Sequence, residues 1–192
     1  ILKYRDEERK HIEKISYQDE TNFIIGHDRR NHFIARLALG QDKNTIILFR
    51  YVQKHGHVLY NLINELNTDP NRPIFFVDGS KGREDRERVR AITEREQNAI
   101  IVASVGTMST GVNIKNLHNL ILAAGGKGRI KVLQSIGRIL RMHGDKDVAR
   151  VYDIIDDLRT KKNANHYYRH YLHRLNYYKE NKMPRKVKEF DL

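Results

Sequence analysis

Side chains suited to phosphate recognition lie in the segment Gln134–Arg141. If this segment is helical, Gln134, Arg138 and Arg141 fall at positions i, i+4 and i+7 and share one face. Two guanidinium groups on one face present forked donors to phosphate oxygens, and Gly137 allows a ligand or a second backbone to come close. The alternative is a surface helix with two solvated arginines, and spacing alone does not choose between the two.

A second candidate is the segment Ser104–Ile114, which directly follows a short apolar run and is rich in glycine and hydroxyl residues. Hydroxyls such as those of Ser104 and Thr107, together with backbone N–H groups, could contact a phosphate at the start of a helix. An ordinary connecting loop of the same composition is the alternative.

The charge of the chain favours a polyanionic partner. Its 192 residues include 36 Lys and Arg against 24 Asp and Glu, a formal net charge of +12. Residues 127–150 hold seven basic and two acidic residues, and residues 161–192 hold nine basic and three acidic residues, so these two stretches carry nearly all of the excess. Clustered positive charge of this size is typical of proteins that bind nucleic acid.

The C-terminal tail, 159–192, combines this charge with half of the ten tyrosines. Lys161, Lys162 and Arg169 could contact phosphates, and Tyr167 could stack on a base. Tyr168 and its apolar neighbours also recur at helical spacing, so the tail could instead pack on the domain through these side chains. Both interpretations stay open at this stage.

Metal binding is disfavoured in the tail and elsewhere. His166, His170 and His173 share helical spacing, but tyrosines and arginines, not acids, lie between them. The acidic group Asp153, Asp156 and Asp157 is better explained as a capped turn after a strand. The chain has no cysteine, which removes disulfides and thiol chemistry and suits a cytoplasmic location.

The elements that must position these residues alternate along the chain. Continuous apolar runs, typical of strands covered on both faces, occur at 45–49, 74–77, 99–103, 120–123 and 149–155. Helix-period segments lie between them, so we expect an α/β domain with a mainly parallel sheet. Asp28 is the expected cap of a helix that runs through Leu39, and no strand is expected after Asp157. The loops at the carboxyl ends of the strands, where ligands bind in such sheets, include Arg50, Gly79 and Ser80.

Together these features resemble a known family. The chain is similar to the C-terminal RecA-like half of superfamily 2 nucleic-acid helicases, in which 45–49 corresponds to motif IV, 104–114 to motif V and 134–141 to motif VI. The flanks are similar to the branch-migrating and type III restriction-like group. The resemblance implies three parts: a linker with the first helices (1–40), the RecA-like domain (41–158) and a basic helical extension (159–192).

The resemblance assigns roles residue by residue. Arg138 and Arg141 correspond to arginine fingers that reach ATP bound on the other half, with Gln134 in support. Gly111 corresponds to the motif V glycine, and Asn113 stands where the family usually has an acid near the ribose, which changes the charge of that contact. Nucleic-acid contacts are implied for Ser104, Thr107 and Arg50, and for the loop that holds Gly79 and Ser80.

The implied activity is that of the second motor domain of an ATP-dependent DNA helicase that acts on branched DNA or RNA:DNA hybrids in recombination, replication and repair. ATP and Mg²⁺ would be bound mainly by the N-terminal RecA-like half. The chain contains neither a Gly-x-x-x-x-Gly-Lys-Ser/Thr loop nor an Asp-Glu-x-Asp/His box, so we expect it to be a fragment without ATPase activity of its own. The alternative is a non-enzymatic module that binds or anneals nucleic acid on the same scaffold. No stretch is long and apolar enough to span a membrane.

Overall fold

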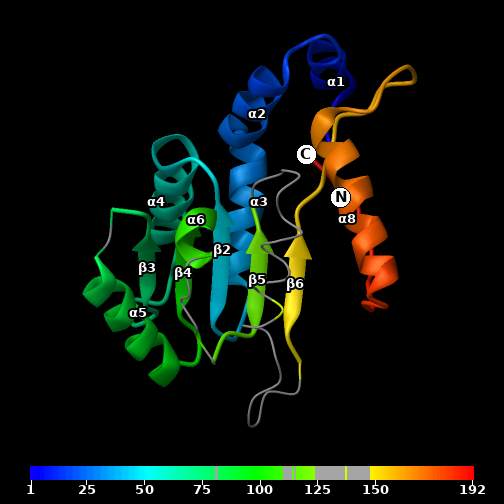
Figure 1. Cartoon of the computed structure of the whole chain (residues 1–192). Coiled ribbons are helices and arrows are strands. Elements are labelled where there is room, and N and C mark those ends of the chain that lie inside the picture. The colour runs from blue at the N-terminus through cyan, green and yellow to red at the C-terminus, as the bar shows by residue number, and fades with distance from the viewer. Residues whose placement is uncertain (81, 110–113, 115, 124–136, 138–147) are drawn as a thin grey trace.

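The computed structural model is built around a five-stranded sheet with the order β3-β4-β2-β5-β6, in which every pair is parallel (Figure 1). It describes residues 1–80, 82–109, 114, 116–123, 137 and 148–192. None of the helices in these ranges is long and apolar enough to cross a membrane. The expected α/β class with a mainly parallel sheet is confirmed.

Helices and strands follow one another in the order expected from the apolar runs. Their bounds are β1 Leu2–Lys3, α1 Asp6–Ile12, α2 Tyr17–Gly26, α3 Asp28–Leu39, β2 Thr45–Phe49, the π-helical turn η1 Val52–Gly56, α4 His57–Leu66, β3 Ile74–Val77, α5 Arg83–Arg95, β4 Ile100–Ser104, α6 Val105–Ser109, β5 Asn119–Leu122, β6 Arg150–Asp153, β7 Asp156–Asp157, α8 His166–Glu180 and β8 Phe190–Asp191.

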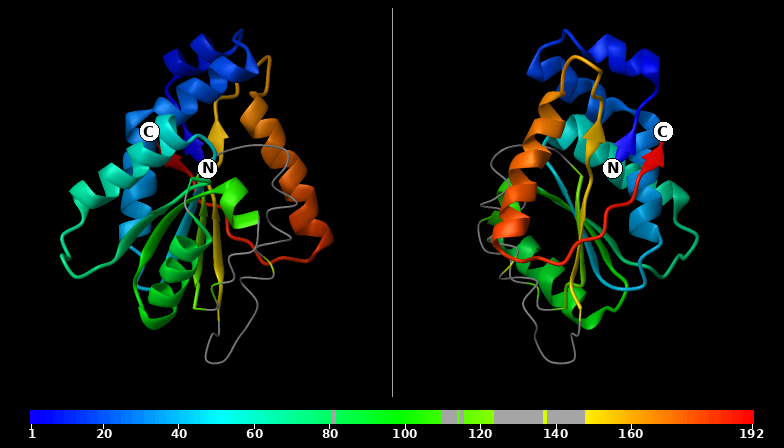
Figure 2. Two further views of the ribbon diagram at one scale, coloured as in Figure 1. Left: turned by 60° about the vertical axis from the view of Figure 1, so that its left-hand side comes forward. Right: turned by 90° about the vertical axis from the view of Figure 1, so that its right-hand side faces the viewer.

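The three central strands of the large sheet, β2, β4 and β5, are buried on both faces, which explains why they read as nearly continuous apolar runs. Along β2, Ile47 and Phe49 belong to one hydrophobic core, and Ile46 and Leu48 belong to a second core on the opposite face. Helices α3 and α4 cover the first face, and α5 and α6 lie over the second (Figure 2). Because successive side chains of a strand point to opposite faces, a strand covered on both faces is apolar at most of its positions.

A small second sheet joins the two ends of the chain. Its order is β7-β1-β8, so β1 lies between two segments from the C-terminal part, and both pairings are parallel. Backbone N–H groups of Phe190 and Leu192 donate to the carbonyls of Ile1 and Lys3, at 2.9 Å each. The expectation that no strand follows Asp157 is therefore wrong. Two-residue strands such as β8 depend on a partner far away in sequence and leave no local pattern.

Helix α3 has the expected span but a different cap. It runs from Asp28 to Leu39 and ends at Gly40, yet the N-cap residue is His27, whose Nδ1 accepts the backbone N–H of Arg30 at 3.2 Å. Asp28 is the first helical residue, where its carboxylate interacts favourably with the helix dipole. The helix of the tail, α8, ends at Glu180.

Gly56 lies against a core aromatic ring at the carboxyl end of β2. A Cβ atom at Gly56 would lie 2.6 Å from two ring carbons of Phe49, which is completely buried. The Phe49 ring also stacks on Phe76, with 5.3 Å between centroids. The ring cannot move away without displacing the core, so this position of the π-helical turn requires glycine.

We expect Gly56→Ala to lower the free energy of unfolding by about 1 to 3 kcal/mol, because an extra methyl group in a packed site forces strain. Urea denaturation followed by circular dichroism measures the effect. The matched control is Gly26→Ala at the end of α2, where a Cβ meets no atom within 4 Å. Equal stability of the two variants would contradict the close-packing argument.

Candidate nucleic-acid and nucleotide interface

Three of the predicted contact loops leave the large sheet at the same edge. Strands β3, β4 and β2 are neighbours, with Val77 paired to Ala103 and Phe49 paired to Ser104. The carboxyl ends of all five strands point the same way in Figure 1. The loops after β3, β4 and β2, the last of which begins at Arg50, therefore start next to one another, as expected for a parallel sheet.

Two hydroxyl groups organise the turn after β4. Oγ of Ser104 lies 2.6 Å from Oγ1 of Thr107, and it accepts the backbone N–H of Thr107 at 3.2 Å. This is the geometry of an N-cap, and it starts the short helix α6. Both side chains are buried, with 9% and 4% exposure. In this arrangement the two hydroxyls pair with each other inside the turn.

The loop after β3 is shaped by Asp78. Its Oδ1 accepts both the backbone N–H of Ser80 at 3.0 Å and the hydroxyl of Ser80 at 2.5 Å, which forms an Asx-turn. Gly79 and Ser80 are exposed at the edge of the sheet. This turn places a small residue and its backbone where a nucleic-acid strand could approach closely.

Arg50 lies between the sheet and helix α2. It is exposed; its Nη1 donates to the phenolic oxygen of Tyr17 at 3.1 Å, and its guanidinium carbon lies 5.4 Å from the centroid of the Tyr51 ring. The ring of Tyr17 in turn lies 5.6 Å from His166 and 5.7 Å from His170 of α8. The carboxyl edge of β2 is thus continuous with an aromatic and cationic surface on α2 and α8.

Five site residues expected from the sequence lie outside the described residues. They are Gln134, Arg138 and Arg141 of motif VI and Gly111 and Asn113 of motif V. Of the motif VI segment the structure describes Gly137, which is helical and exposed. The roles of these five residues stay predictions.

The predicted base-stacking role of Tyr167 does not fit its position. Its side chain is 2% exposed and belongs to the main hydrophobic core. The ring stacks on Tyr17 at 6.0 Å, the hydroxyl donates to Oγ1 of Thr21 at 3.3 Å, and burial raises the pKa of Tyr167 to about 12. No face of this ring is available to a base, so the structural alternative left open by the sequence is favoured here.

Helix α8 is attached to the domain through its amino end. The buried carboxylate of Glu20 accepts the backbone N–H groups of His166 and Tyr167 at 2.9 and 2.8 Å and the side-chain amide of Asn165 at 2.9 Å. A carboxylate satisfies free helix donors and is favoured by the helix dipole. Contacts between residues that lie 145 to 147 positions apart in the sequence thereby fix where helix α8 begins.

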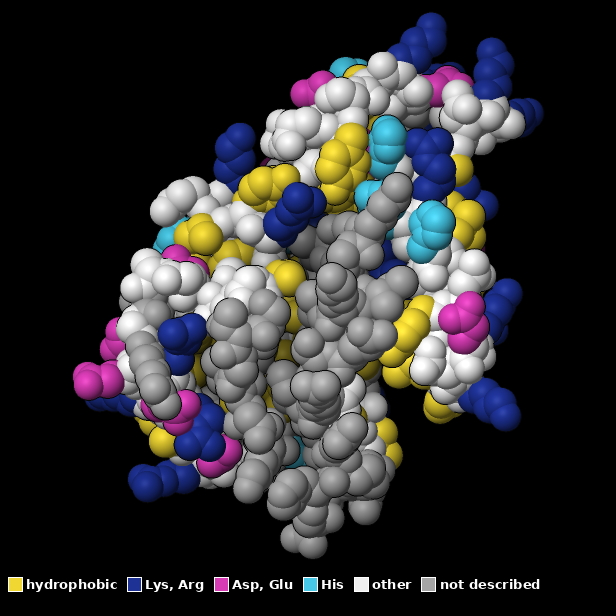
Figure 3. Space-filling view, in the orientation of Figure 1, with side chains coloured by type: hydrophobic (Ala, Val, Ile, Leu, Met, Phe, Trp, Pro, Cys, Tyr) yellow, Lys and Arg dark blue, Asp and Glu magenta, His cyan; other side chains and the backbone are white. Residues whose placement is uncertain are grey.

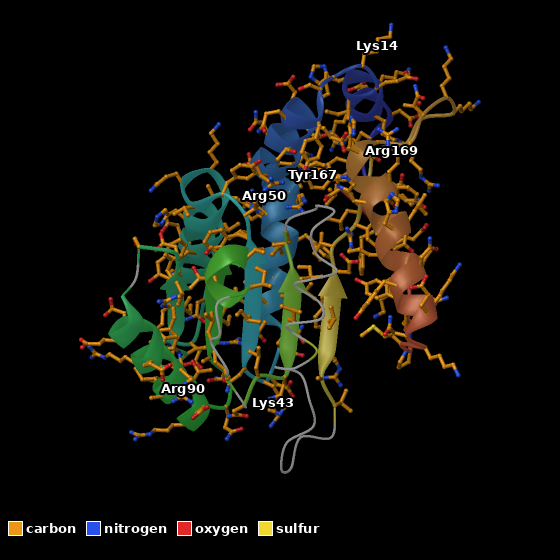
Figure 4. The ribbon with its side chains drawn as sticks, in the orientation of Figure 1. Lys14, Lys43, Arg50, Arg90, Tyr167 and Arg169 are labelled. Carbon is orange, nitrogen blue, oxygen red and sulfur yellow. The ribbon has the colours of Figure 1, made fainter. Side chains whose placement is uncertain are left out.

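The basic candidates of the tail remain at the surface. Lys161, Lys162 and Arg169 are exposed, and Nη2 of Arg169 lies 3.2 Å from Nδ1 of His166. Figure 4 shows Arg169 and Arg50 on the same upper end of the molecule, on either side of Tyr167. In the tail, Tyr167 packs in the core, whereas Lys161, Lys162 and Arg169 stay accessible.

The three aspartates near the end of β6 are acceptors for basic and phenolic groups. Asp153 binds Arg174 at 2.8 and 3.0 Å and Tyr178 at 2.8 Å. Burial opposes ionisation of Asp157, but hydrogen bonds from Arg159 and then Lys3 outweigh it and lower the pKa of Asp157 to about 2. The expected capped turn is thus a set of ion pairs. Across the part of the chain that the structure describes, no group of three or more His, Asp or Glu could hold a metal ion.

A buried charge network at the end of β5 was not expected from the sequence. Arg30 of α3 donates from Nε to Asp156 at 2.6 Å and from Nη2 to the carbonyl of Ala123 at 2.6 Å, and the Tyr4 hydroxyl also donates to Asp156, at 2.8 Å. Both charged side chains have no exposed surface. The available signal was helical spacing, since Arg30 is four residues before the buried Ile34.

The comparison with protein families decides the classification. The helicase conserved C-terminal domain matches residues 29–143, which is more than half of the chain. The chain belongs to this family. The assignment made from motifs IV, V and VI is confirmed, and the matched range contains all three motifs.

A phage helicase resembles nearly the whole chain. The ATP-dependent DNA helicase UvsW of Enterobacteria phage T4 is 39% identical over 181 residues, which cover 92% of this chain and 35% of UvsW. The crystal structure of T4 UvsW aligns with a TM-score of 0.84 at 35% identity and covers 99% of this chain and 40% of that one. The chain therefore spans well under half the length of this relative.

More distant structures share the fold. S. cerevisiae Dbp5 bound to RNA and ADP BeF3 aligns with a TM-score of 0.55 at 14% identity, over 85% of this chain and 38% of Dbp5. The type ISP restriction-modification enzyme LlaBIII bound to DNA aligns with a TM-score of 0.54 at 15% identity, over 100% of this chain and 15% of that enzyme. At this level of identity the likeness shows a common fold.

We expect Asp157→Asn to remove part of the acid sensitivity of the domain. The pKa of Asp157 is lower in the folded state, so its contribution is complete above the unfolded value of 3.8 and is lost as the pH falls toward about 2. The variant should be less stable at neutral pH by on the order of 1 to 2 kcal/mol, and the difference should shrink between pH 4 and pH 2. Urea titrations across this pH range measure it.

The matched control is Asp42→Asn, because Asp42 is exposed and forms no ion pair with any of the described residues. A stability difference for Asp157→Asn that stays constant from neutral pH down to pH 2 would contradict the lowered pKa.

Proposed function

We propose that this chain is the second motor domain of an ATP-dependent DNA helicase that acts on branched DNA or RNA:DNA hybrids. The observation that carries the proposal is the likeness to T4 UvsW over almost the whole chain, in sequence and in fold. The family match over 29–143 supports the same activity class. By the same likeness we infer a role in recombination, replication and repair, with a cytoplasmic location.

ATP hydrolysis in this proposal takes place between two halves of one protein. Arg138 and Arg141 stabilise the charge on the transferring phosphoryl group, and Gln134 supports them. Gly111 and Asn113 lie near the nucleotide. We assign the phosphate groups and Mg²⁺ mainly to the N-terminal RecA-like half, because this sequence lacks the phosphate loop and acidic box that hold them.

The nucleic-acid strand runs, in this proposal, along the carboxyl edge of the sheet. Arg50 supplies a charged donor, the turn at Gly79 and Ser80 supplies backbone and a hydroxyl, and the turn at Ser104 and Thr107 supplies the third contact. The adjacency of these loops at β3, β4 and β2 supports a single path. Opening and closing of the cleft between the halves would then move this edge relative to the strand.

The tail supplies further cations beside this path. Lys161, Lys162 and Arg169 are exposed cations on the 159–165 segment and on α8. Phosphate contacts of this kind position a strand without reading its bases, which suits an enzyme that moves along any sequence.

We expect residues 1 to 192 alone to have negligible ATPase activity with or without DNA. The chain supplies the arginine side of the cleft, whereas phosphoryl transfer also needs a phosphate loop and a magnesium-holding acid. A coupled assay of phosphate release measures this. Magnesium-dependent turnover by the purified chain that is lost in Arg138→Ala would contradict the division of labour between two halves.

In the intact protein, we expect Arg141→Ala to lower the rate of ATP hydrolysis on the order of 10³-fold while DNA affinity changes little, because the loss is confined to the transition state. Steady-state kinetics and DNA binding by fluorescence anisotropy measure the two effects. The matched control is Arg90→Ala on α5, where the partly exposed Arg90 pairs with Glu87 and Glu94. Near-normal turnover in folded Arg141→Ala would transfer the finger role to Arg138.

A further inference from the structure

A hollow of about 570 Å³ lies where α1 faces the loop that follows β7. Both views of Figure 2 show α1, in dark blue, beside this orange loop at one end of the molecule. Its lining consists entirely of charged side chains and one threonine. Pockets for small molecules are lined mostly by apolar and aromatic groups, so this composition favours a charged ligand.

The charge of the lining is positive, with six basic and three acidic residues. Each acid already has a partner. Asp6 binds Arg9 at 2.6 Å, Glu13 accepts the hydroxyl of Thr160 at 3.1 Å, and Asp157 is held by two cations as described above. Nε of Arg9 is buried and meets no acceptor among the described residues. The carboxylates therefore hold the walls together and leave the excess positive charge uncompensated.

Three lysines carry this excess. Lys10, Lys161 and Lys162 are exposed, and none lies within 4 Å of a carboxylate among the residues described. The loop that carries two of them is fixed by Thr160, whose hydroxyl oxygen accepts the backbone N–H groups of Lys162 at 3.3 Å and Asn163 at 3.2 Å. Figure 3 shows Lys and Arg side chains, in dark blue, gathered at this upper right end.

We propose that this hollow binds the phosphate backbone of a nucleic-acid strand through Lys10, Lys161 and Lys162, outside the path along the carboxyl edge. The inference rests on the proposed function, because it takes nucleic acid as the polyanion present. Two separate chain segments supply the cations, an arrangement that suits successive phosphates of a polymer better than one convergent anion. Lysines on flexible stems act as point charges and contact a backbone without selecting its bases.

The test is the salt dependence of binding of a labelled oligothymidylate strand to the 192-residue chain. The triple variant Lys10→Gln, Lys161→Gln and Lys162→Gln should bind roughly tenfold more weakly at low salt. The slope of log affinity against log salt should flatten by about 0.7 for each lost phosphate contact. The substituted side chains are exposed and unpaired, so the thermal melting temperature should stay close to that of the unchanged chain.

The control is a second triple variant, Lys43→Gln, Lys179→Gln and Lys182→Gln, which lowers the net charge equally but at exposed lysines away from the hollow. An equal loss of affinity in both variants, or no loss in the first, would overturn the assignment. If the first variant loses no affinity, a loss of affinity in Arg50→Gln would show that the strand binds along the carboxyl edge without the hollow. Absence of binding by the unchanged chain would contradict the nucleic-acid function itself. Competition by inorganic phosphate at micromolar concentration would indicate a free-anion site and also overturn the proposal.

Discussion

The buried ion pair between Arg30 and Asp156 is the constraint on which the arrangement of the domain depends. Burial works against the charged form of Arg30, but the charge and hydrogen bond of Asp156, together with contributions from Tyr4 and Tyr167, outweigh it and raise the pKa of Arg30 above its ordinary value. Such a pair is costly to desolvate and costs several kcal/mol more if one partner is removed. The main effect of this ion pair is therefore to require one arrangement of the elements that carry Arg30 and Asp156. Only when α3, β7 and the end of β5 at Ala123 are all in place do Nε and Nη2 of Arg30 meet their acceptors.

The flanking segments follow from the same constraint. Asp156 also accepts the hydroxyl of Tyr4, so the residues after β1 are fixed beside β7, and β1 can then pair with β8 on its other side. Neighbouring Asp153 holds Arg174 of α8, while Glu20 holds the beginning of that helix. The N-terminal helices and the C-terminal tail are thus joined to the sheet by charged contacts at one strand end. The large sheet, the N-terminal helices and helix α8 are thus packed against one another.

The sequence predicts the parts of this fold that are determined locally. The central strands of the large sheet are recognisable because most of their positions, such as Ile46 and Ile47, are apolar when both faces are covered. The loops at Arg50 and Ser80 were placed correctly because parallel strands end at a common edge. Contacts between distant residues could not be found in this way. The Glu20 cap joins residues more than 140 positions apart, and nothing local marks Tyr167 as a core residue.

Net charge alone is therefore an incomplete guide to the binding surface, because burial divides the basic residues into two groups. Arg174 is neutralised in the interior, and Arg72 donates to the carbonyls of Leu39, Gln41 and Asn98 at 2.7 to 2.8 Å, where it closes the end of α3. Such arginines add to the formal charge but are already committed to backbone or carboxylate acceptors. A polyanion meets the cations without partners, and in the described part of the tail these include Lys161 and Lys162. The tyrosines beside them enable this division: by packing the tail onto the core, they hold its lysines at fixed positions on the surface.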